Sequence, residues 1–235
     1  MILLRNIYNK GGLLIYSIIE FSKIKKNILI INKEGKNIIH QQLLDNCIIG
    51  ELDIKEDEQN IRIINSYEES RRENEYIVFK KEYENEKEIK ENCIIRINDK
   101  FIPFAYFFKF YKKGKYTILY IFKNNITKIN HMFYGCSSLT ILNLSYFKAN
   151  KVTNMSDIFN ECSSLKNINL SYFNANNITD MSGMSRGCSS LKNINLSNFN
   201  TNKAKDMSDM FKGCSSLKQE NIITKDKIIL AQIKK

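Results

Sequence analysis

The sequence predicts an α/β fold. We expect a short solenoid in which each 26-residue repeat supplies one parallel strand and one short helix, preceded by a small α+β domain. The first observation is the spacing of Cys136, Cys162, Cys188 and Cys214, which stand 26 residues apart and each open the motif C-S-S-L. The second is that the apolar residues of each repeat change from a strand period to a helical period. A fixed period of roughly 20 to 50 residues is typical of solenoids, because stacked copies bury an apolar face that one copy cannot.

The first half of each repeat predicts a strand. Leu142 and Leu144 alternate with Asn143 and Ser145, so the leucines are expected in the core and the polar residues outside. Stacked parallel strands lie about 4.8 Å apart, which turns each repeat position into a column. The predicted protein-binding face consists of the outward columns, with Asn221 expected to extend one of them: Asn143, Ser145, Asn167, Asn169, Ser171, Asn193, Asn195 and Ser197. Stacked amides that hydrogen-bond only to one another are an equally good interpretation of these columns.

The second half of each repeat predicts a short helix. Val152, Met155, Ile158 and Phe159 recur at helical spacing, and Thr153 is the expected N-cap. The four repeat cysteines are expected to be buried, each filling its turn as a small apolar residue.

These repeats resemble the BspA-like leucine-rich-repeat family. The resemblance is carried by MFYGCSSLTILNLSYF at 132–147, CSSLKNINLSYFNANNITDMSGM at 162–184 and CSSLKNINLSNFNTNKAKDMSDMF at 188–211. It covers about residues 122–218 and implies a leucine-rich-repeat solenoid for 123–218. The family occurs in bacteria and protists and includes surface adhesins, so the resemblance implies a binding protein and allows a surface location.

Residues 1–49 form a poorly defined N-terminal segment. An amphipathic helix is expected at 13–24, and a hairpin around Glu34 and Gly35. The longest uncharged run near the start, 11–19, is too short to cross a bilayer. No signal-peptide pattern is visible. We therefore predict neither a signal peptide nor a transmembrane segment.

Residues 50–122 are predicted to be a small α+β domain. The expected elements are strands at 50–54 and 61–65, a charged helix at 66–76, a second polar helix or a loop at 82–92, and an antiparallel meander of 93–98, 101–110 and 116–122. The meander is expected to cap the solenoid, since a shift of 26 residues places Ile118 under Leu144 and Phe133 under Phe159. At the other end, residues 219–235 are expected to form the C-terminal cap.

The formal charge of +11 is unevenly distributed. Residues 51–91 hold 14 acids and 8 bases, a net charge of −6, whereas residues 123–235 hold 15 bases and 7 acids, a net charge of +8. A basic solenoid is compatible with nucleic acid or anionic lipid. The lysines are not interleaved with aromatic residues, however, so solvated lysines are favoured and no nucleic-acid partner is expected.

No catalytic or metal-binding pattern is found, and we predict that the protein is not an enzyme and holds no cofactor. The chain has no C-x-x-C pair, no glycine-rich phosphate loop and no G-x-S-x-G turn. Asn154, Asp180 and Asp206 share a column. Their expected role is to cap the starts of the short helices. The repeat cysteines lie near enough for disulfides, although free buried thiols are favoured.

The predicted function is a monomeric, non-enzymatic protein-interaction module that uses the sheet face to bind a protein partner. A surface adhesin of BspA type and a basic nucleic-acid or lipid binder are the alternatives. The cytoplasm is the expected location, because glycans on a sequon column only about 4.8 Å apart would obstruct one another. That column contains Asn143, Asn169 and Asn195.

Overall fold

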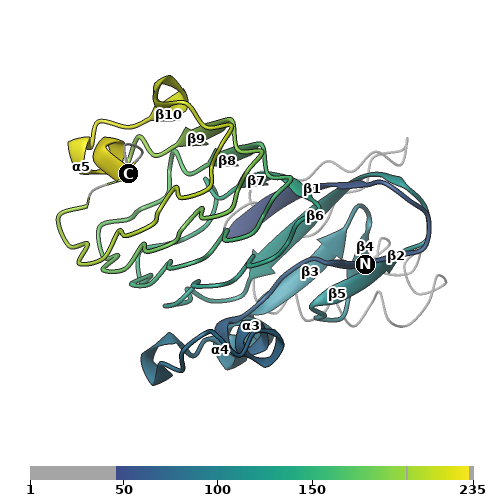
Figure 1. Ribbon diagram of the computed structural model, residues 1–235. Helices are drawn as coiled ribbons and strands as arrows, with labels where there is room; N and C mark the ends of the chain where they lie inside the picture. The colour runs from purple at the N-terminus through teal and green to yellow at the C-terminus, as the bar shows by residue number, and fades with distance from the viewer. Residues whose placement is uncertain (1–45, 200, 233–235) are drawn as a thin grey trace, which may run out of the picture.

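The computed structural model describes residues 46–199 and 201–232 (Figure 1). The helix and hairpin predicted within 1–45 lie outside the described residues. The strands are β1 (Cys47–Ile54), β2 (Gln59–Arg62), β3 (Cys93–Ile97), β4 (Lys100–Ile102), β5 (Phe107–Phe110), β6 (Gly114–Phe122), β7 (Leu139–Asn143), β8 (Asn167–Asn169), β9 (Asn193–Asn195) and β10 (Ile222–Ile223). The helices are α3 (Tyr67–Glu73), α4 (Glu86–Asn92) and α5 (Lys227–Ala231), with short 3-10 turns η1 (Lys81–Tyr83) and η2 (Gln219–Asn221).

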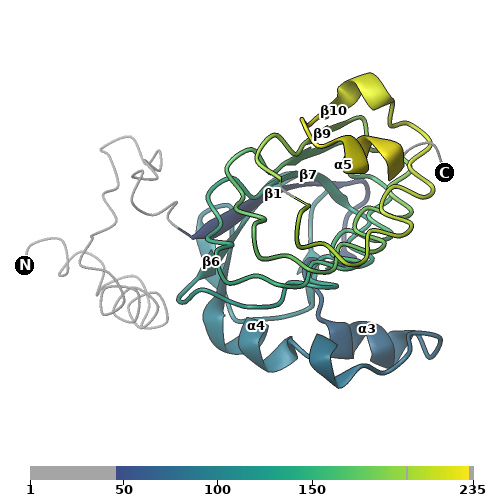
Figure 2. The same cartoon turned by 90° about the vertical axis from the view of Figure 1, so that its left-hand side faces the viewer.

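One eight-stranded sheet runs through the molecule in the order β10-β9-β8-β7-β1-β6-β3-β4. Strands β7 to β10 pair in parallel, which we call the parallel half, and β1, β6, β3 and β4 pair antiparallel, which we call the antiparallel half. The prediction of parallel repeat strands is confirmed. Figure 2 looks along the stack and shows the repeats nested one behind another.

The core of the parallel half consists of columns of identical or similar side chains. Leu142 pairs with Ile168 and Ile168 with Ile194, and all three are at most 2% exposed. The rings of Phe147 and Phe173 stack with centroids 6.1 Å apart, and that column continues to Phe199. Each repeat thus buries its apolar side chains against the same residue of its neighbour.

The helix predicted in the second half of each repeat is wrong, and the chain forms a run of turns there, which we call the turn segment. In the first repeat, alternate N–H groups from Met155 to Glu161 donate to carbonyls of the next repeat at 2.9–3.0 Å. An N–H between them, that of Asn160, donates to the residue three positions earlier. Because half of the donors leave the repeat, no helix forms, and Thr153 caps none.

Two residues in each turn segment adopt a left-handed backbone, which a continuous helix cannot contain. They form two columns, so the same conformation recurs in every repeat. The first column, with φ between 53° and 59°, is His131, Asp157, Gly183 and Asp209, and the second, with φ between 60° and 78°, is Gly135, Glu161, Gly187 and Gly213.

Strand β1 joins the two halves of the sheet, because it lies between β6 and β7 and is antiparallel to both. Gly50 pairs with Ile118 on one side and Leu142 on the other. A Cβ atom at Gly50 would lie 2.8 Å from Ile118 Cγ2 and 3.1 Å from Leu139 Cδ2, so only glycine fits between these side chains.

The predicted strand neighbour of the first repeat is therefore wrong. Residues 116–122 do not lie next to Leu142, because the apolar inward face of β1 takes that place and is buried. The second part of that expectation, that Phe133 lies under Phe159, is confirmed. The N–H of Phe133 donates to the carbonyl of Ile158 at 2.9 Å, so residues 126–135 stack on the first repeat as an additional turn segment.

The predicted three-strand meander is also wrong. Strand β3 pairs with β4 in a hairpin and directly with β6, whereas β5 leaves and pairs with β2 in a separate two-stranded sheet. The single strand expected at 101–110 is divided after Ile102, where Pro103 follows. Proline lacks the N–H that a strand interior needs, so the chain changes sheets at this point.

The segment between the two sheets forms an arm, residues 66–92, which contains α3, η1 and α4 and lies below the turn segments in Figure 1. The predicted charged helix is present as α3, and of the residues 82–92, where a second polar helix or a loop was expected, Glu86–Asn92 form α4. The Ser66 hydroxyl accepts the N–H of Glu69 and begins α3. Arg72 in α3 bonds to Glu86 in α4 at 2.8 Å, and this ion pair holds the two helices together.

The C-terminal segment extends the stack with a shifted register. Ile222 of β10 pairs with Ile194, and Ile223 pairs with Asn195. The expectation that Asn221 continues the asparagine column is therefore wrong, because η2 adds two residues before β10. Asp226 caps α5, and Ile229 of this helix is fully buried in the main core.

Candidate functional site

Two features of the described residues are candidates for a functional site: the polar columns on the sheet and a cavity beside the turn segments. The polar columns are only partly available. Asn143 Oδ1 accepts the N–H of Ser145 at 3.0 Å, and Asn169 and Asn195 form the same bond in their own repeats. These carbonyls close the turn after each strand. The predicted amide ladder along this column is not found among the described residues.

A ladder bond is present one position earlier. Asn193 Nδ2 donates to Asn167 Oδ1 at 2.8 Å. Asn193 is exposed, whereas the other seven predicted face residues are half-buried. Two tyrosines lie beside the columns at the ends of β7 and β8: Tyr146 is 41% exposed and Tyr172 is 78% exposed. The sheet face is therefore a neutral surface of amides and hydroxyls bordered by aromatic rings.

The cysteine column is structural. Cys136, Cys162 and Cys188 are buried and Cys214 is half-buried, and all four are free thiols. The Cys162 thiol donates to the Phe133 carbonyl at 3.0 Å, and Cys188 and Cys214 make the equivalent bond to the preceding repeat. Burial raises the pKa of Cys162 well above its ordinary value. These thiols remain protonated and bond one repeat to the next.

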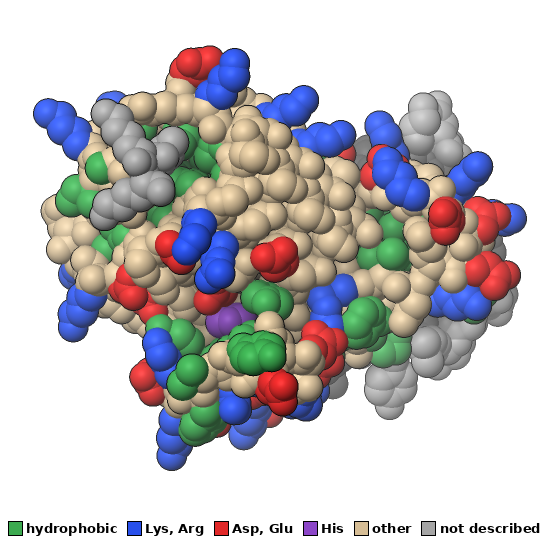
Figure 3. Space-filling model, viewed as in Figure 1, with side chains coloured by type: hydrophobic (Ala, Val, Ile, Leu, Met, Phe, Trp, Pro, Cys, Tyr) green, Lys and Arg blue, Asp and Glu red, His purple; other side chains and the backbone are tan. Residues whose placement is uncertain are grey.

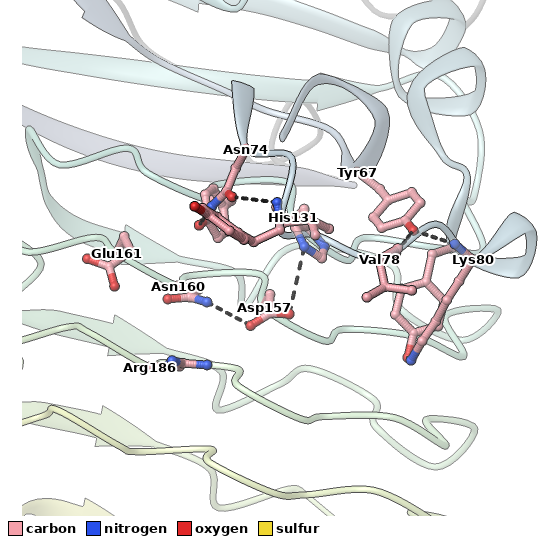
Figure 4. A pocket seen from close by; sticks show the side chains of 13 residues that line it. Tyr67, Asn74, Val78, Lys80, His131, Asp157, Asn160, Glu161 and Arg186 are labelled. Atoms are coloured by element: carbon pink, nitrogen blue, oxygen red, sulfur yellow. Dashed lines mark hydrogen bonds and ion pairs between the residues drawn. The ribbon is translucent and has the colours of Figure 1, made fainter. Parts of the chain in front are cut away.

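A cavity of about 540 Å³ opens between the arm and the turn segments (Figure 4). One wall comes from the arm, with Tyr67 on α3 and Lys80 before η1, and the other comes from turn residues such as His131, Asp157 and Arg186. Figure 3 shows a histidine side chain, in purple, in a recess below the centre of the view and bordered by hydrophobic side chains.

The centre of the cavity contains His131, Asp157 and Asn160. His131 Nε2 lies 3.7 Å from Asp157 Oδ2, and Asn160 Nδ2 donates to Asp157 Oδ1 at 2.8 Å. Burial lowers the pKa of His131 to about 3 and raises the pKa of Asp157. Because the imidazole is neutral at pH 7, its contact with Asp157 is not an ion pair.

Aromatic rings surround the histidine. The rings of Tyr67 and His131 meet edge to face with centroids 5.2 Å apart, and Tyr134 stacks on His131 at 5.4 Å. The Tyr67 hydroxyl donates to the Val78 carbonyl at 2.6 Å and accepts the Lys80 N–H at 2.5 Å. These bonds hold the loop of the arm over the cavity.

The two cations at the cavity contact other groups. Lys80 Nζ bonds to the Tyr83 hydroxyl at 3.1 Å and lies 4.4 Å from the centre of that ring. The Tyr83 hydroxyl also donates to Asp180 in the second repeat. Arg186 Nη1 lies 3.9 Å from Asp209 Oδ2 in the third repeat. Both contacts tie the cavity rim to the repeats.

Sequence reasoning missed this cavity, because its walls come from segments that no repeat pattern joins. The signal available was the column of His131, Asp157, Gly183 and Asp209, in which polar residues and glycine share one position. Asn and Asp tolerate a left-handed backbone, which such a mixture indicates. The helix caps predicted at Asn154, Asp180 and Asp206 are wrong, because no helix follows: each side chain closes a turn by accepting the N–H of the serine two residues later.

Neither a metal site nor a membrane span is found in the part of the chain that the structure describes. Within residues 46–199 and 201–232, no group of three or more His, Cys, Asp or Glu side chains is placed to hold a metal ion. No helix in these residues is long and apolar enough to cross a bilayer.

Comparison with protein-family models returns a match that includes the repeats. Residues 105–225, just over half of the chain, match a family model described as "Mycoplasma protein of unknown function, DUF285". No curated protein and no solved structure matches the chain.

Proposed function

The chain belongs to the DUF285 family, and from this premise we propose that it is a non-enzymatic interaction module whose sheet face binds a protein partner. We further propose that its repeats are leucine-rich repeats of the BspA-like kind. The parallel pairing of β7 to β10 and the stacked turn segments support this assignment.

The observation that carries the proposal is the repetition of one polar motif across three paired strands. In each repeat the asparagine carbonyl is used by its own turn, which leaves the amide Nδ2 and the nearby serine hydroxyl without partners among the described residues. The motif recurs at Asn143, Asn169 and Asn195, whose Cα atoms pair in register. A row of donors at strand spacing suits the backbone carbonyls or amides of an extended polypeptide.

The exposed tyrosines add to this argument. Tyrosine is enriched at protein interfaces because its rigid ring covers a large area and its hydroxyl can hydrogen-bond. Tyr172 exposes 78% of its surface beside the amide column. We expect Tyr172 to be the strongest single contributor to partner binding.

A photo-crosslinking residue at position 171 tests the proposal. Ser171 lies on the sheet face, and the matched control is Asn176, which is exposed in the turn after β8. In cells of the native host, we expect a discrete crosslinked product from position 171, which untagged protein competes away, and none from position 176. Equal products from both positions, or none from position 171, would contradict the proposal.

The basic alternative has one supporting observation, an exposed column formed by Lys166, Lys192 and Lys218. The salt dependence of partner binding distinguishes this alternative from the sheet-face proposal. Binding through three lysine–phosphate contacts weakens by roughly fortyfold between about 50 and about 200 mM salt, whereas amide-mediated binding changes little. A steep salt dependence of the captured partner would favour the basic binder.

A further inference from the structure

Two residues that line the cavity between the arm and the turn segments each have a buried polar atom without a hydrogen-bond partner among the described residues. The atoms are His131 Nδ1 and Asn160 Oδ1. His131 is 3% exposed and Asn160 is 7% exposed, and both residues line the cavity. Buried polar atoms are nearly always paired in folded proteins, so two unpaired atoms on residues that line one cavity indicate a missing partner.

Both unpaired atoms are acceptors. Asn160 Nδ2 already donates to Asp157, so the free atom is the amide oxygen. His131 Nε2 faces the Asp157 carboxylate at 3.7 Å, which favours the tautomer with the proton on Nε2 and a lone pair on Nδ1. A ligand that satisfies both atoms must bring hydrogen-bond donors.

The charge at the centre of the cavity is only partly compensated. Asp157 is 28% exposed, and His131, whose Nε2 lies 3.7 Å from its carboxylate, is neutral. Burial raises the pKa of Asp157 more than Arg186 and Lys80 lower it, and the close contacts of these two cations are with Asp209 and Tyr83. Glu161, a second carboxylate, lines the same cavity. A cationic ligand would compensate this charge, whereas an anion would meet two carboxylates.

The next repeat leaves space for the Asp157 carboxylate. A Cβ atom at Gly183 would lie 2.2 Å from Asp157 Oδ1, so any other residue at this position in the column would displace the carboxylate. Asp209 occupies the same position one repeat further on. The glycine therefore allows the carboxylate to lie at the cavity floor.

The walls suit a cation as well. Tyr67 and Tyr134 flank His131, and Tyr76, which is 87% exposed, lies on the loop that borders the cavity. The faces of aromatic rings attract cations. Figure 4 shows the Asp157 carboxylate between the arm and Arg186, with His131 and Asn160 on either side.

We propose that this cavity binds a primary ammonium or guanidinium group carried on an aliphatic chain, with Asp157 as its counter-ion and Asn160 and His131 as hydrogen-bond acceptors. The volume of about 540 Å³ lies in the range of pockets that hold small ligands. A quaternary ammonium has no N–H and leaves both acceptors unpaired. The site therefore selects for N–H donors and not for positive charge alone.

Calorimetric titration of the full chain tests the proposal with butylammonium, ethylguanidinium, tetramethylammonium and acetate as probes. We expect the first two to bind and the last two to bind at least about tenfold more weakly. Asp157→Asn keeps a residue that tolerates the left-handed backbone and should weaken butylammonium binding about tenfold or more. Asp206→Asn, which lies outside the cavity and retains its turn-forming oxygen, is the matched control and should bind as the original protein does.

Amide chemical shifts of the unsubstituted protein provide a readout that does not depend on the variant folding. Shifts on adding butylammonium should concentrate at His131, Asp157 and Asn160. A blocked peptide with one central lysine distinguishes two kinds of ligand. If the peptide binds, the ligand is a side chain of a polypeptide. If butylammonium binds and the peptide does not, the ligand is a free amine. Equal binding of tetramethylammonium, preferential binding of acetate, or unchanged affinity in Asp157→Asn would each overturn the proposal.

Discussion

The two halves of the large sheet are built by different rules although they share one core. In the parallel half, each strand pairs with the equivalent residues of the next repeat, as Leu142 does with Ile168. In the antiparallel half, β1 pairs with β6 and β7, which lie far from it in the chain and have no sequence relation to it. Repetition therefore defines pairing in one half, and complementarity of apolar faces defines it in the other.

The outer faces of the two halves differ as well. The antiparallel half carries a second apolar cluster of Cys47, Leu119 and Ile121, with Ile49 packed against it. The parallel half carries amides and hydroxyls at the corresponding outward positions, such as Asn143 and Asn169. The comparison teaches that the repeats keep one face polar for solvent or a partner, whereas the antiparallel half carries an apolar cluster on that face too.

The largest expected effect comes from breaking the junction between the halves. Leu52 in β1 is 1% exposed and pairs with Tyr116 and Leu139, one from each half. We expect Leu52→Asp to lower the free energy of unfolding by about 4 kcal/mol or more, because it buries an unpaired charge. Urea unfolding followed by circular dichroism measures this.

The adjacent, exposed Glu51 provides the control for that experiment. Glu51→Ala should change stability by about 0.5 kcal/mol at most. If the Leu52→Asp protein instead unfolded in two steps, with the second as stable as before, the halves would be independent and the shared core would not couple them.

The next effect concerns the regularity of the parallel half. The rings of Phe133 and Phe159 stack with centroids 6.2 Å apart, but the next position in this column is Ser185, which is fully buried with an unpaired hydroxyl. Ser185→Phe should stabilise the protein by about 1–3 kcal/mol, since a ring adds buried apolar area. The thermal midpoint measures the change.

Ser185→Ala separates the two causes of that gain, because it removes the unpaired hydroxyl and adds no ring. We expect Ser185→Ala to stabilise less than Ser185→Phe. A lower midpoint for Ser185→Phe would show that neighbouring side chains already occupy the space and that the ring overpacks the column.

A smaller effect on stability distinguishes the arm from the repeats. Ion pairs stabilise the arm, whereas apolar columns stabilise the repeats. Arg72, followed by Lys90 and Tyr106, lowers the pKa of Glu86 from 4.5 to about 2. A lowered folded-state pKa stabilises the protein above the unfolded value, and this contribution is lost as pH falls from about 4.5 towards 2. Glu86→Gln should therefore cost about 1–2 kcal/mol at pH 7 and flatten that acid dependence.

Glu91 on the same helix is the control, because its side chain is 64% exposed and lies 4.0 Å from Lys87. Glu91→Gln should change neither the stability at pH 7 nor the acid dependence measurably. Equal acid dependence in the Glu86→Gln and original proteins would show that other carboxylates govern it.

The smallest effect concerns the cysteine column and leaves stability unchanged. Cys214 is half-buried with a pKa raised by burial to about 12, whereas Cys136, Cys162 and Cys188 are buried. On brief alkylation of the native protein at pH 8, we expect mass spectrometry to find label first at Cys214, since only thiolates react. Equal labelling of Cys162 would show that the stack opens between repeats.

The sequence by itself determined what recurs every 26 residues: the parallel strands, the inward leucines and isoleucines, and the stacking of equivalent positions, including Phe133 on Phe159. It also determined helix α3, because Ser66 and the charges of its first and last turns act locally. The repeat period identifies the equivalent residues of successive repeats, and these residues stack on one another.

Only the tertiary structure decided the rest. Apolar residues three and four positions apart fit either a helix or a run of turns. Turns form here because the backbone hydrogen-bonds to the neighbouring repeat. Strand β1 enters between β6 and β7 because its apolar face and Gly50 fit both neighbours. The cavity at His131 and Asp157 forms because the arm folds over the turn segments, and no pattern local to either segment encodes that contact.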